Sequence, residues 1–204
     1  ISATQLGGIV KMTGFILKGC LLVELAGAVF YSFVFIPEFG LVKGLWYSVF
    51  HSVSAFCNAG FDLFGQLQPG ASLMPFQNDP VVLLTLMGLI VVGGLGFFVW
   101  EEVVRLHSFK KFSVYTKLVL LTSGVLILGG AAFILALEWN NPNTLGPMQT
   151  GEKILNGFFQ SVSLRTAGFA SVDQALLTDS GKAVSMVLMF IGGSSGSTAG
   201  GLKT

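Results

Sequence analysis

Long uncharged apolar runs recur along the chain. A helix of about 20 apolar residues, rising about 1.5 Å per residue, is long enough to cross roughly 30 Å of hydrocarbon. The pattern therefore predicts several membrane-spanning helices. The first apolar run is interrupted by two charges, and the last ends in a segment rich in glycine and serine. The runs are Met12–Ile36, Val81–Trp100, Leu118–Leu137 and Ala183–Leu202.

The two charges in the first run are Lys18 and Glu24. A lysine near a helix end can extend its ammonium group to the membrane interface. Glu24 lies deeper, where an acid is costly and often functional. Two interpretations of Glu24 stay open: a functional intramembrane acid, or a protonated or paired glutamate between helices.

Two further apolar segments are too short to span a membrane. Gly44–Phe56 and Ile154–Leu164 each follow a polar, turn-rich connection and each end near an Ala-Gly-Phe sequence. Apolar segments of this length are typical of re-entrant or interfacial pieces. We expect each to enter the membrane as a short helix and to return as irregular backbone.

The order of long segment, short segment, Ala-Gly-Phe and long segment occurs twice. FHSVSAFCNAGF (Phe50–Phe61) matches FFQSVSLRTAGF (Phe158–Phe169) with a one-residue gap. VVGGLG (Val91–Gly96) likewise matches FIGGSSG (Phe190–Gly196). Self-similarity in both hydrophobicity and two separate motifs indicates an internal repeat.

Composition and charge exclude some classes of function. Of the 204 residues, 52% are hydrophobic and only 10% are charged, a charged fraction far below that of a soluble domain. The net charge of +1 gives no positive field of the kind that attracts nucleic acid. The two cysteines form neither a disulfide framework nor a metal-binding pattern, and both histidines are expected to be packing residues. Basic residues collect in 105–117, which predicts that this connection is cytoplasmic and that the short segments lie on the outer side. The basic residues are Arg105, Lys110, Lys111 and Lys117.

The two Ala-Gly-Phe segments are candidate ion filters. Irregular backbone survives inside a membrane only where it faces protein or a watery path, and carbonyl oxygens there can replace the hydration shell of a cation. Glycine suits such a turn because it accepts unusual conformations and leaves the path open. Phe61 and Phe169 are expected to pack the filter wall, and a pair of tight extracellular turns is the alternative. The candidate ion-binding residues are Cys57, Asn58, Ala59, Gly60, Arg165, Thr166, Ala167 and Gly168.

The last residues, IGGSSGSTAGGLKT (Ile191–Thr204), partly match a phosphate-binding loop. Gly196 and Gly201 have the spacing of the Walker motif, but Leu202 separates Gly201 from Lys203. The motif also lacks a preceding strand and follows an apolar run. We therefore reject a nucleotide site here and expect the segment to lie in the membrane.

These motifs, in this order, resemble the superfamily of Trk, Ktr and HKT potassium and sodium transporters, most closely the bacterial Ktr/Trk membrane subunit. SVSAFCNAGF is similar to the second pore loop of that family and SVSLRTAGF to the third. GGLGFFVWEEV (Gly93–Val103) resembles the inner helix of the second repeat. The resemblance implies an all-α membrane protein in which membrane–pore loop–membrane repeats surround a pseudo-fourfold cation pore, and the chain would cover about one and a half to two repeats.

The resemblance also assigns roles along the chain. Residues 1–10 would end the preceding repeat or its cytoplasmic connection, 11–111 would form the second repeat and 112–204 the third. The closing segment would break the third inner helix as a hinged gate loop below the filter, and Lys203 would either extend to the cytoplasmic interface or hold that loop. The expected elements are outer helix 12–36, pore helix 44–56, filter 57–61, inner helix 80–107, outer helix 114–139, pore helix 153–164, filter 165–169 and broken inner helix 182–204 with gate loop 192–201. The gate-loop residues are Gly192, Gly193, Ser194, Ser195, Gly196, Ser197, Thr198, Ala199, Gly200, Gly201 and Lys203.

The implied function is that of a non-enzymatic, pore-forming subunit for potassium uptake in the inner membrane. Sodium transport within the same superfamily, a broken-helix carrier and a non-transporting membrane scaffold are the alternatives. The family implies a homodimer and a cytosolic nucleotide-binding regulatory ring, with no cofactor in this chain and nucleotide only through that partner. The resembling third pore loops also carry an arginine at the position of Arg165, so its side chain is expected to point behind the filter and hold it through hydrogen bonds to carbonyls, with direct tuning of ion entry as the alternative. We also expect the chain to be an internal piece of a longer protein.

Overall fold

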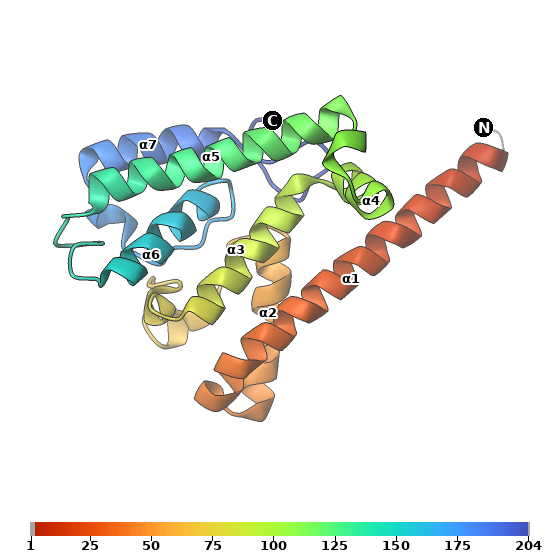
Figure 1. Ribbon diagram of the computed structural model, residues 1–204. Helices are drawn as coiled ribbons and strands as arrows, with labels where there is room; N and C mark the ends of the chain where they lie inside the picture. Colours follow the sequence, from red (N-terminus) through yellow and green to blue (C-terminus); the bar gives the residue numbers. More distant parts are fainter. Residues whose placement is uncertain (1–2, 204) are drawn as a thin grey trace.

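The computed structural model describes residues 3–203, with side chains from residue 10 onward. This part of the chain is all-helical, as expected, and its one β-bridge, between Ile191 and Leu202, belongs to no strand (Figure 1). Thr204, the last residue of the expected inner helix, lies outside the described residues. The α-helices are α1 (Ala3–Phe39), α2 (Leu41–Phe56), α3 (Pro80–Leu95), α4 (Phe97–Leu106), α5 (Val114–Glu138), α6 (Thr150–Ser163) and α7 (Asp179–Phe190). The short 3₁₀ helices are Phe64–Gln66, Met74–Phe76, Phe109–Lys111 and Gln174–Leu176.

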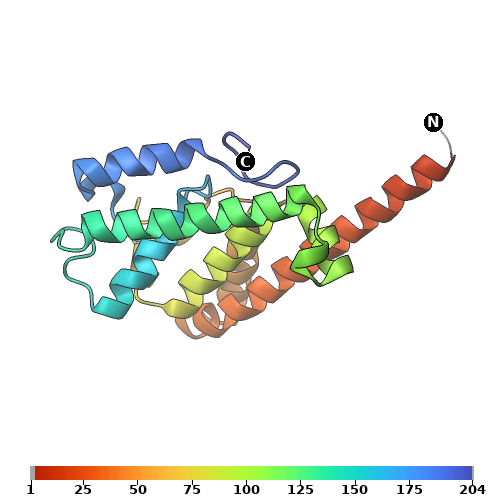
Figure 2. The same cartoon turned by 45° about the horizontal axis from the view of Figure 1, so that its top comes forward.

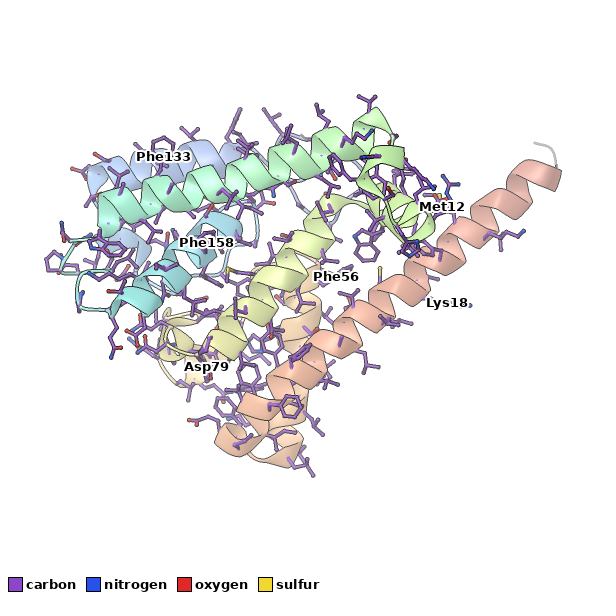
Figure 3. All side chains as sticks on the ribbon, viewed as in Figure 1. Met12, Lys18, Phe56, Asp79, Phe133 and Phe158 are labelled. Carbon is purple, nitrogen blue, oxygen red and sulfur yellow. The ribbon has the colours of Figure 1, made fainter. Side chains whose placement is uncertain are left out.

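The long helices α1 and α5 occupy the positions of the expected outer helices of the two copies. Both are long and apolar enough to cross a membrane, and the bent pair α3 and α4 would count as a third span. α1 is longer than the expected 12–36, because no proline or turn sequence separates residues 3–10 from the apolar run. Exposed apolar side chains such as Phe133 on α5, 63% exposed, cover their outer faces (Figure 3). Such faces suit contact with lipid acyl chains.

The first copy folds back tightly at Gly40. This residue has a φ of 79°, which glycine accepts readily, and α2 begins immediately after it. Gly44 then lets α2 lie against the end of α1, because a Cβ at this position would come 2.5 Å from the carbonyl oxygen of Phe35. α1 and α2 consequently run side by side as an antiparallel pair (Figure 1).

The expected inner helix 80–107 is wrong as a single helix. It is divided into α3 and α4, which meet at 97°. Gly96 at the break has a φ of 89°, and the N–H of Phe97 donates to the carbonyl oxygen of Gly196 at 3.0 Å. A contact 99 residues away in the sequence thus satisfies a backbone N–H group that the break would otherwise leave unpaired. At its other end, α3 is capped by Asp79, whose carboxylate accepts hydrogen bonds from the N–H groups of Val81 and Val82 (Figure 3).

The second copy repeats the arrangement with α5, α6 and α7. α6 begins with a capping box between Gln149 and Glu152, and α7 begins at Thr178, whose hydroxyl accepts the N–H of Gly181. α7 runs alongside α5 and leads into the closing loop near the C-terminus (Figure 2).

Glu138 joins the ends of α5 and α7. Its side chain is fully buried, and its carboxylate accepts hydrogen bonds from the Thr178 N–H at 2.9 Å and the Thr178 hydroxyl at 2.6 Å. Asn141 at 2.7 Å and Thr144 at 2.8 Å donate to the other oxygen. Four neutral donors therefore solvate this buried acid, as a buried charge requires.

One hydrophobic core extends through both copies. Tyr31 and Phe35 of α1 form an aromatic cluster with Phe64, which follows the first candidate filter. Phe159 and Val162 of α6 belong to the same core. This core holds the two short helices, and hence the candidate filters that follow them, in a common framework.

Candidate functional site

The two candidate filter turns have the same backbone design. In each, the residue two positions before the glycine is left-handed: Asn58 has a φ of 51° and Thr166 a φ of 70°. The glycines follow with φ values of 74° at Gly60 and 86° at Gly168. Non-glycine residues rarely adopt positive φ, so its recurrence at matched positions marks the turns as one structure used twice.

The first serine of each Ser-Val-Ser motif ties its short helix to an outer helix. The Ser52 hydroxyl donates to the Glu24 carbonyl oxygen at 2.6 Å, and the Ser161 hydroxyl donates to that of Ile127 at 2.8 Å. A glycine faces each hydroxyl. A Cβ would come 2.5 Å from the Ser52 oxygen at Gly27 and 2.4 Å from the Ser161 oxygen at Gly130.

The second serine of each motif closes the turn itself. The Ser54 hydroxyl donates to the Phe61 carbonyl oxygen at 2.7 Å and accepts the Phe61 N–H at 3.0 Å. In the other copy, the Ser163 hydroxyl donates to the carbonyl oxygen of Phe169. The Ser-Val-Ser motif is visible in the sequence, but its role is not. Its partners are backbone atoms, which no residue pattern identifies.

The two turns meet at their glycines. A Cβ on Gly60 would lie 2.5 Å from the carbonyl oxygen of Ala167 and 3.1 Å from the Cα of Gly168. The absence of side chains at this point allows the two backbones to approach closely. Gly60 and Gly168 are therefore neighbours in space, although they are 108 residues apart in the sequence.

The two phenylalanines after the glycines differ. Phe169 is buried in the common core, whereas Phe61 is 69% exposed in the described part of the chain, and its packing on a filter wall stays a prediction. Two hydrogen bonds with Ser54 fix the Phe61 backbone. Cys57 is also exposed, whereas Asn58 and Ala167 are buried.

Arg165 lies behind the second turn and is 7% exposed. One of its guanidinium nitrogens lies 3.4 Å from both the Ser123 hydroxyl of α5 and the Gly192 carbonyl oxygen of the closing loop. Its carbonyl partner thus belongs to the candidate gate loop, whereas we expected filter carbonyls.

The closing segment is a loop whose two ends are joined. The N–H of Gly192 donates to the Leu202 carbonyl oxygen at 2.9 Å, and the N–H of Leu202 donates to that of Phe190 at 3.1 Å. Helix α7 ends at Phe190, so residues 192–201 form a compact loop (Figure 2). Lys203 caps the base, because its ammonium group donates to the Ala199 carbonyl oxygen.

The same loop is docked on the break between α3 and α4. The Ser194 N–H donates to the Gly94 carbonyl oxygen at 3.1 Å, and the Thr198 N–H donates to that of Gly93 at 3.2 Å. The Tyr115 hydroxyl of α5 donates to the Ser195 carbonyl oxygen at 3.0 Å. A phosphate-binding loop needs free, convergent N–H groups. Here several N–H groups already bond to protein oxygens, which supports the rejection of a nucleotide site.

His51 supports the segment after the first turn. The Tyr47 carbonyl oxygen lies 2.7 Å from Nδ1, and the N–H of Leu63 donates to Nε2 at 3.3 Å. Since Nε2 accepts, the proton is assigned to Nδ1 in a neutral ring, which also stacks on Phe64 with centroids 4.3 Å apart. This packing histidine also positions the return of the chain from the turn. In the described part of the chain, no cluster of three or more His, Cys, Asp or Glu side chains could hold a metal ion.

Comparison with known proteins decides the family. The model of the family described as "TrkH: Cation transport protein" matches residues 2–204. The chain belongs to this family. The potassium/sodium uptake protein NtpJ of Enterococcus hirae is 43% identical over 204 residues, which are 100% of this chain and 44% of that protein. The Ktr system potassium uptake protein B of Vibrio alginolyticus is 46% identical over 186 residues, which are 90% of this chain and 40% of that protein.

A solved structure shows the same fold. The crystal structure of the potassium transporter TrkH from Vibrio parahaemolyticus matches with a TM-score of 0.68 at 20% identity, covering 100% of this chain and 39% of that one. The chain of this TrkH family member thus spans less than half the length of the relatives it matches. Membership of this family and the two long apolar helices together indicate a membrane protein.

Proposed function

We propose that this chain forms part of the pore of a potassium uptake transporter and contributes two filter turns and one gate loop. The observation that supports this most is the meeting of two matched turns at Gly60 and Gly168. Two equivalent turns that touch at their glycines have the geometry of neighbouring positions around a common axis. Backbone carbonyls placed around such an axis can substitute for the water shell of a cation.

Potassium is the proposed cargo, with sodium as the alternative ion. Glycine occupies both filter positions, and related proteins are named for potassium uptake or for potassium/sodium uptake. The ion would bind carbonyl oxygens of residues 57–60 and 165–168. The closing loop, residues 192–201, would regulate passage beneath these turns from its docked position.

The whole protein is proposed to lie in the inner membrane with its filter turns outside and residues 105–117 in the cytoplasm. We further propose a homodimer regulated by a cytosolic nucleotide-binding ring. The mass of the purified full-length protein in detergent tests the dimer. A pull-down of cytosolic proteins with and without nucleotide tests the ring, and a monomeric mass or the absence of a nucleotide-binding partner would contradict these two proposals.

The function is tested by rubidium and sodium uptake in a transport-deficient cell that expresses the full-length protein. Uptake above background is expected for the wild type. Gly60→Ala should abolish it, because a Cβ there would both strain a backbone with a φ of 74° and contact Ala167. The matched control is Gly70→Ala, which has a φ of 76° but no atom within 4 Å of the added Cβ.

The control separates backbone strain from blockage of the filter. If Gly70→Ala transports ions and Gly60→Ala does not, although both reach the membrane, the filter assignment is supported. A wild-type protein that reaches the membrane and carries neither rubidium nor sodium would overturn the transporter proposal in favour of a scaffold. Uptake that requires a second, co-transported substrate would favour the broken-helix carrier.

A further inference from the structure

The left-handed residues of both filter turns contact the closing loop. The Asn58 side-chain amide donates to the Thr198 hydroxyl at 3.0 Å. In the other turn, the Thr166 hydroxyl accepts the N–H of Gly200 at 2.9 Å. Asn58 and Thr166 occupy matched places, each two residues before its glycine. The same position of the repeat therefore binds the loop from two sides.

The left-handed conformation of Thr166 is unusual. Asparagine tolerates positive φ, but a β-branched residue there is a genuine outlier that persists only where its surroundings hold it. The hydrogen bond to Gly200 is one contact that holds it. A strained residue that is stabilised by the loop will respond when the loop leaves.

Thr198 relays the contact on the other side. Its hydroxyl accepts from Asn58 and donates to the Phe56 carbonyl oxygen at 2.8 Å, and its N–H donates to the Gly93 carbonyl oxygen. The end of α2, the first filter turn and the break after α3 are thus joined through one threonine. The loop cannot leave its site without breaking the contacts with both turns.

The docked state also leaves polar atoms unsatisfied. Asn58 Oδ1 and Arg165 Nε are buried without a hydrogen-bond partner among the described residues. Both residues line one small cavity, which Gly193 and Ala199 of the loop close. Release of the loop would admit water to these two atoms, and their hydration would offset part of the cost of the broken hydrogen bonds. This hydration would favour the released state and so reduce the free-energy difference between the docked and released states.

We propose that Asn58 and Thr166 are positioning residues that couple the two filter turns to the gate loop. The loop docks where both turns hold their left-handed residue in place, and its release frees both turns. Because coupling between two sites is reciprocal, ion occupancy of the turns should change how tightly the loop docks. This inference rests on the proposed filter and gate, and goes beyond them by naming the residues that connect the two.

Amide hydrogen exchange of the full-length protein tests the coupling without relying on flux. The informative variants are Thr166→Val and Thr198→Val, which remove a hydroxyl and keep the β-branched shape. Thr166→Ser and Thr198→Ser, which keep the hydroxyl, are the matched controls. The loop amide of Ser194 should exchange about fivefold faster in Thr166→Val, the effect of losing one ordinary hydrogen bond on the docking equilibrium. It should exchange at least that much faster in Thr198→Val, which loses two.

The pattern of exchange separates coupling from local damage. A purely local effect of Thr166→Val would alter the Gly200 amide, which loses its acceptor, and leave Ser194 unchanged. Coupling also requires that the wild-type exchange rate differ between saturating potassium and an impermeant organic cation, and that this difference shrink in both valine variants. One variant lies in the second turn and the other in the loop against the first turn, so the test can still be made if one of them fails to fold.

Unchanged Ser194 exchange in both valine variants, or equal exchange in the valine and serine variants, would overturn the coupling. Rubidium uptake by the same full-length protein distinguishes this from failure of the proposed function. Uptake with hydroxyl-independent exchange rejects the coupling alone. A hydroxyl-dependent loop in a protein that carries no ion rejects the transporter proposal and, with it, the role of the contact in transport.

Discussion

The hydroxyl of Ser161 occupies the space that a side chain at position 130 would fill, because a Cβ on Gly130 would lie 2.4 Å from that oxygen. The hydroxyl uses this closeness to reach the Ile127 carbonyl oxygen of α5. Gly27 and Ser52 repeat the relationship on α1. In both copies, then, a glycine on the long helix and a serine on the short helix fix how closely the two helices pack. This packing positions the turn that follows the short helix.

Replacement of Gly130 by alanine should destabilise the protein. The added methyl would force the short helix away from α5 and break the Ser161 hydrogen bond, at a cost of about 1–3 kcal/mol. The thermal unfolding midpoint of the full-length protein in detergent should fall. The adjacent Gly129 provides the control, because nothing lies within 4 Å of a Cβ there, and alanine should stabilise the helix by up to about 1 kcal/mol. Equal midpoints for the two variants would contradict this account.

Ser163→Ala should loosen the second filter turn. Its hydroxyl is 3% exposed and donates to the Phe169 carbonyl oxygen, so its loss leaves a buried acceptor unpaired, which costs about 1–3 kcal/mol. We expect a lower unfolding midpoint and weaker discrimination between rubidium and sodium in uptake assays. Ser171 serves as the control, since it is equally buried and its hydroxyl has no partner among the described residues. A selectivity loss of the same size in Ser171→Ala would show that burial, and not closure of the turn, is responsible.

The long apolar runs and the repeat were visible in the sequence because they are local. Hydropathy marks α1 and α5, and the turn residues around Gly60 and Gly168 mark where the short helices end. The all-helical fold follows from these features, and the structure and the family confirm it.

Features set by distant contacts could not be predicted in this way. The break at Gly96 is accompanied by a hydrogen bond from the N–H of Phe97 to Gly196, and no proline in this part of the sequence indicates a break. The hydrogen bond from the Asn58 side chain to Thr198 of the closing loop likewise joins residues 140 apart, and no local pattern in the sequence marks it.

Arg165→Gln should weaken the tie between the second turn and its surroundings. The guanidinium group bridges Ser123 of α5 and Gly192 of the closing loop, and a shorter amide cannot reach both. We expect a loss of about 1–3 kcal/mol in stability, together with a lower apparent affinity for rubidium. Arg105→Gln is the control, because that arginine is exposed and forms a surface pair with Glu101 worth a few tenths of a kcal/mol. Unchanged stability and ion affinity in Arg165→Gln would rule out the scaffold role.

Glu138→Gln should detach the N-terminal end of α7. An amide can accept with one oxygen only, so at least two of the four donors from Thr178, Asn141 and Thr144 lose their acceptor. The unfolding midpoint should fall by an amount equivalent to about 1–3 kcal/mol. Glu152→Gln tests the specificity of the effect, because glutamine preserves a capping box and should leave the midpoint nearly unchanged. Equal behaviour of the two variants would show that the Glu138 network adds no stability.

Deletion of Gly196–Gly200 from the full-length protein should raise ion flux. The deleted residues include Thr198 and Gly200, which contact the two filter turns, and Gly196, which accepts the N–H of Phe97. The base of the loop, formed by Gly192 and Leu202, stays in place, so α7 keeps its connection to the chain that follows. Rubidium uptake should increase because the loop no longer reaches beneath the turns. Size-exclusion chromatography must show that the variant is folded, and a folded variant with unchanged flux would show that residues 192–201 are not a gate.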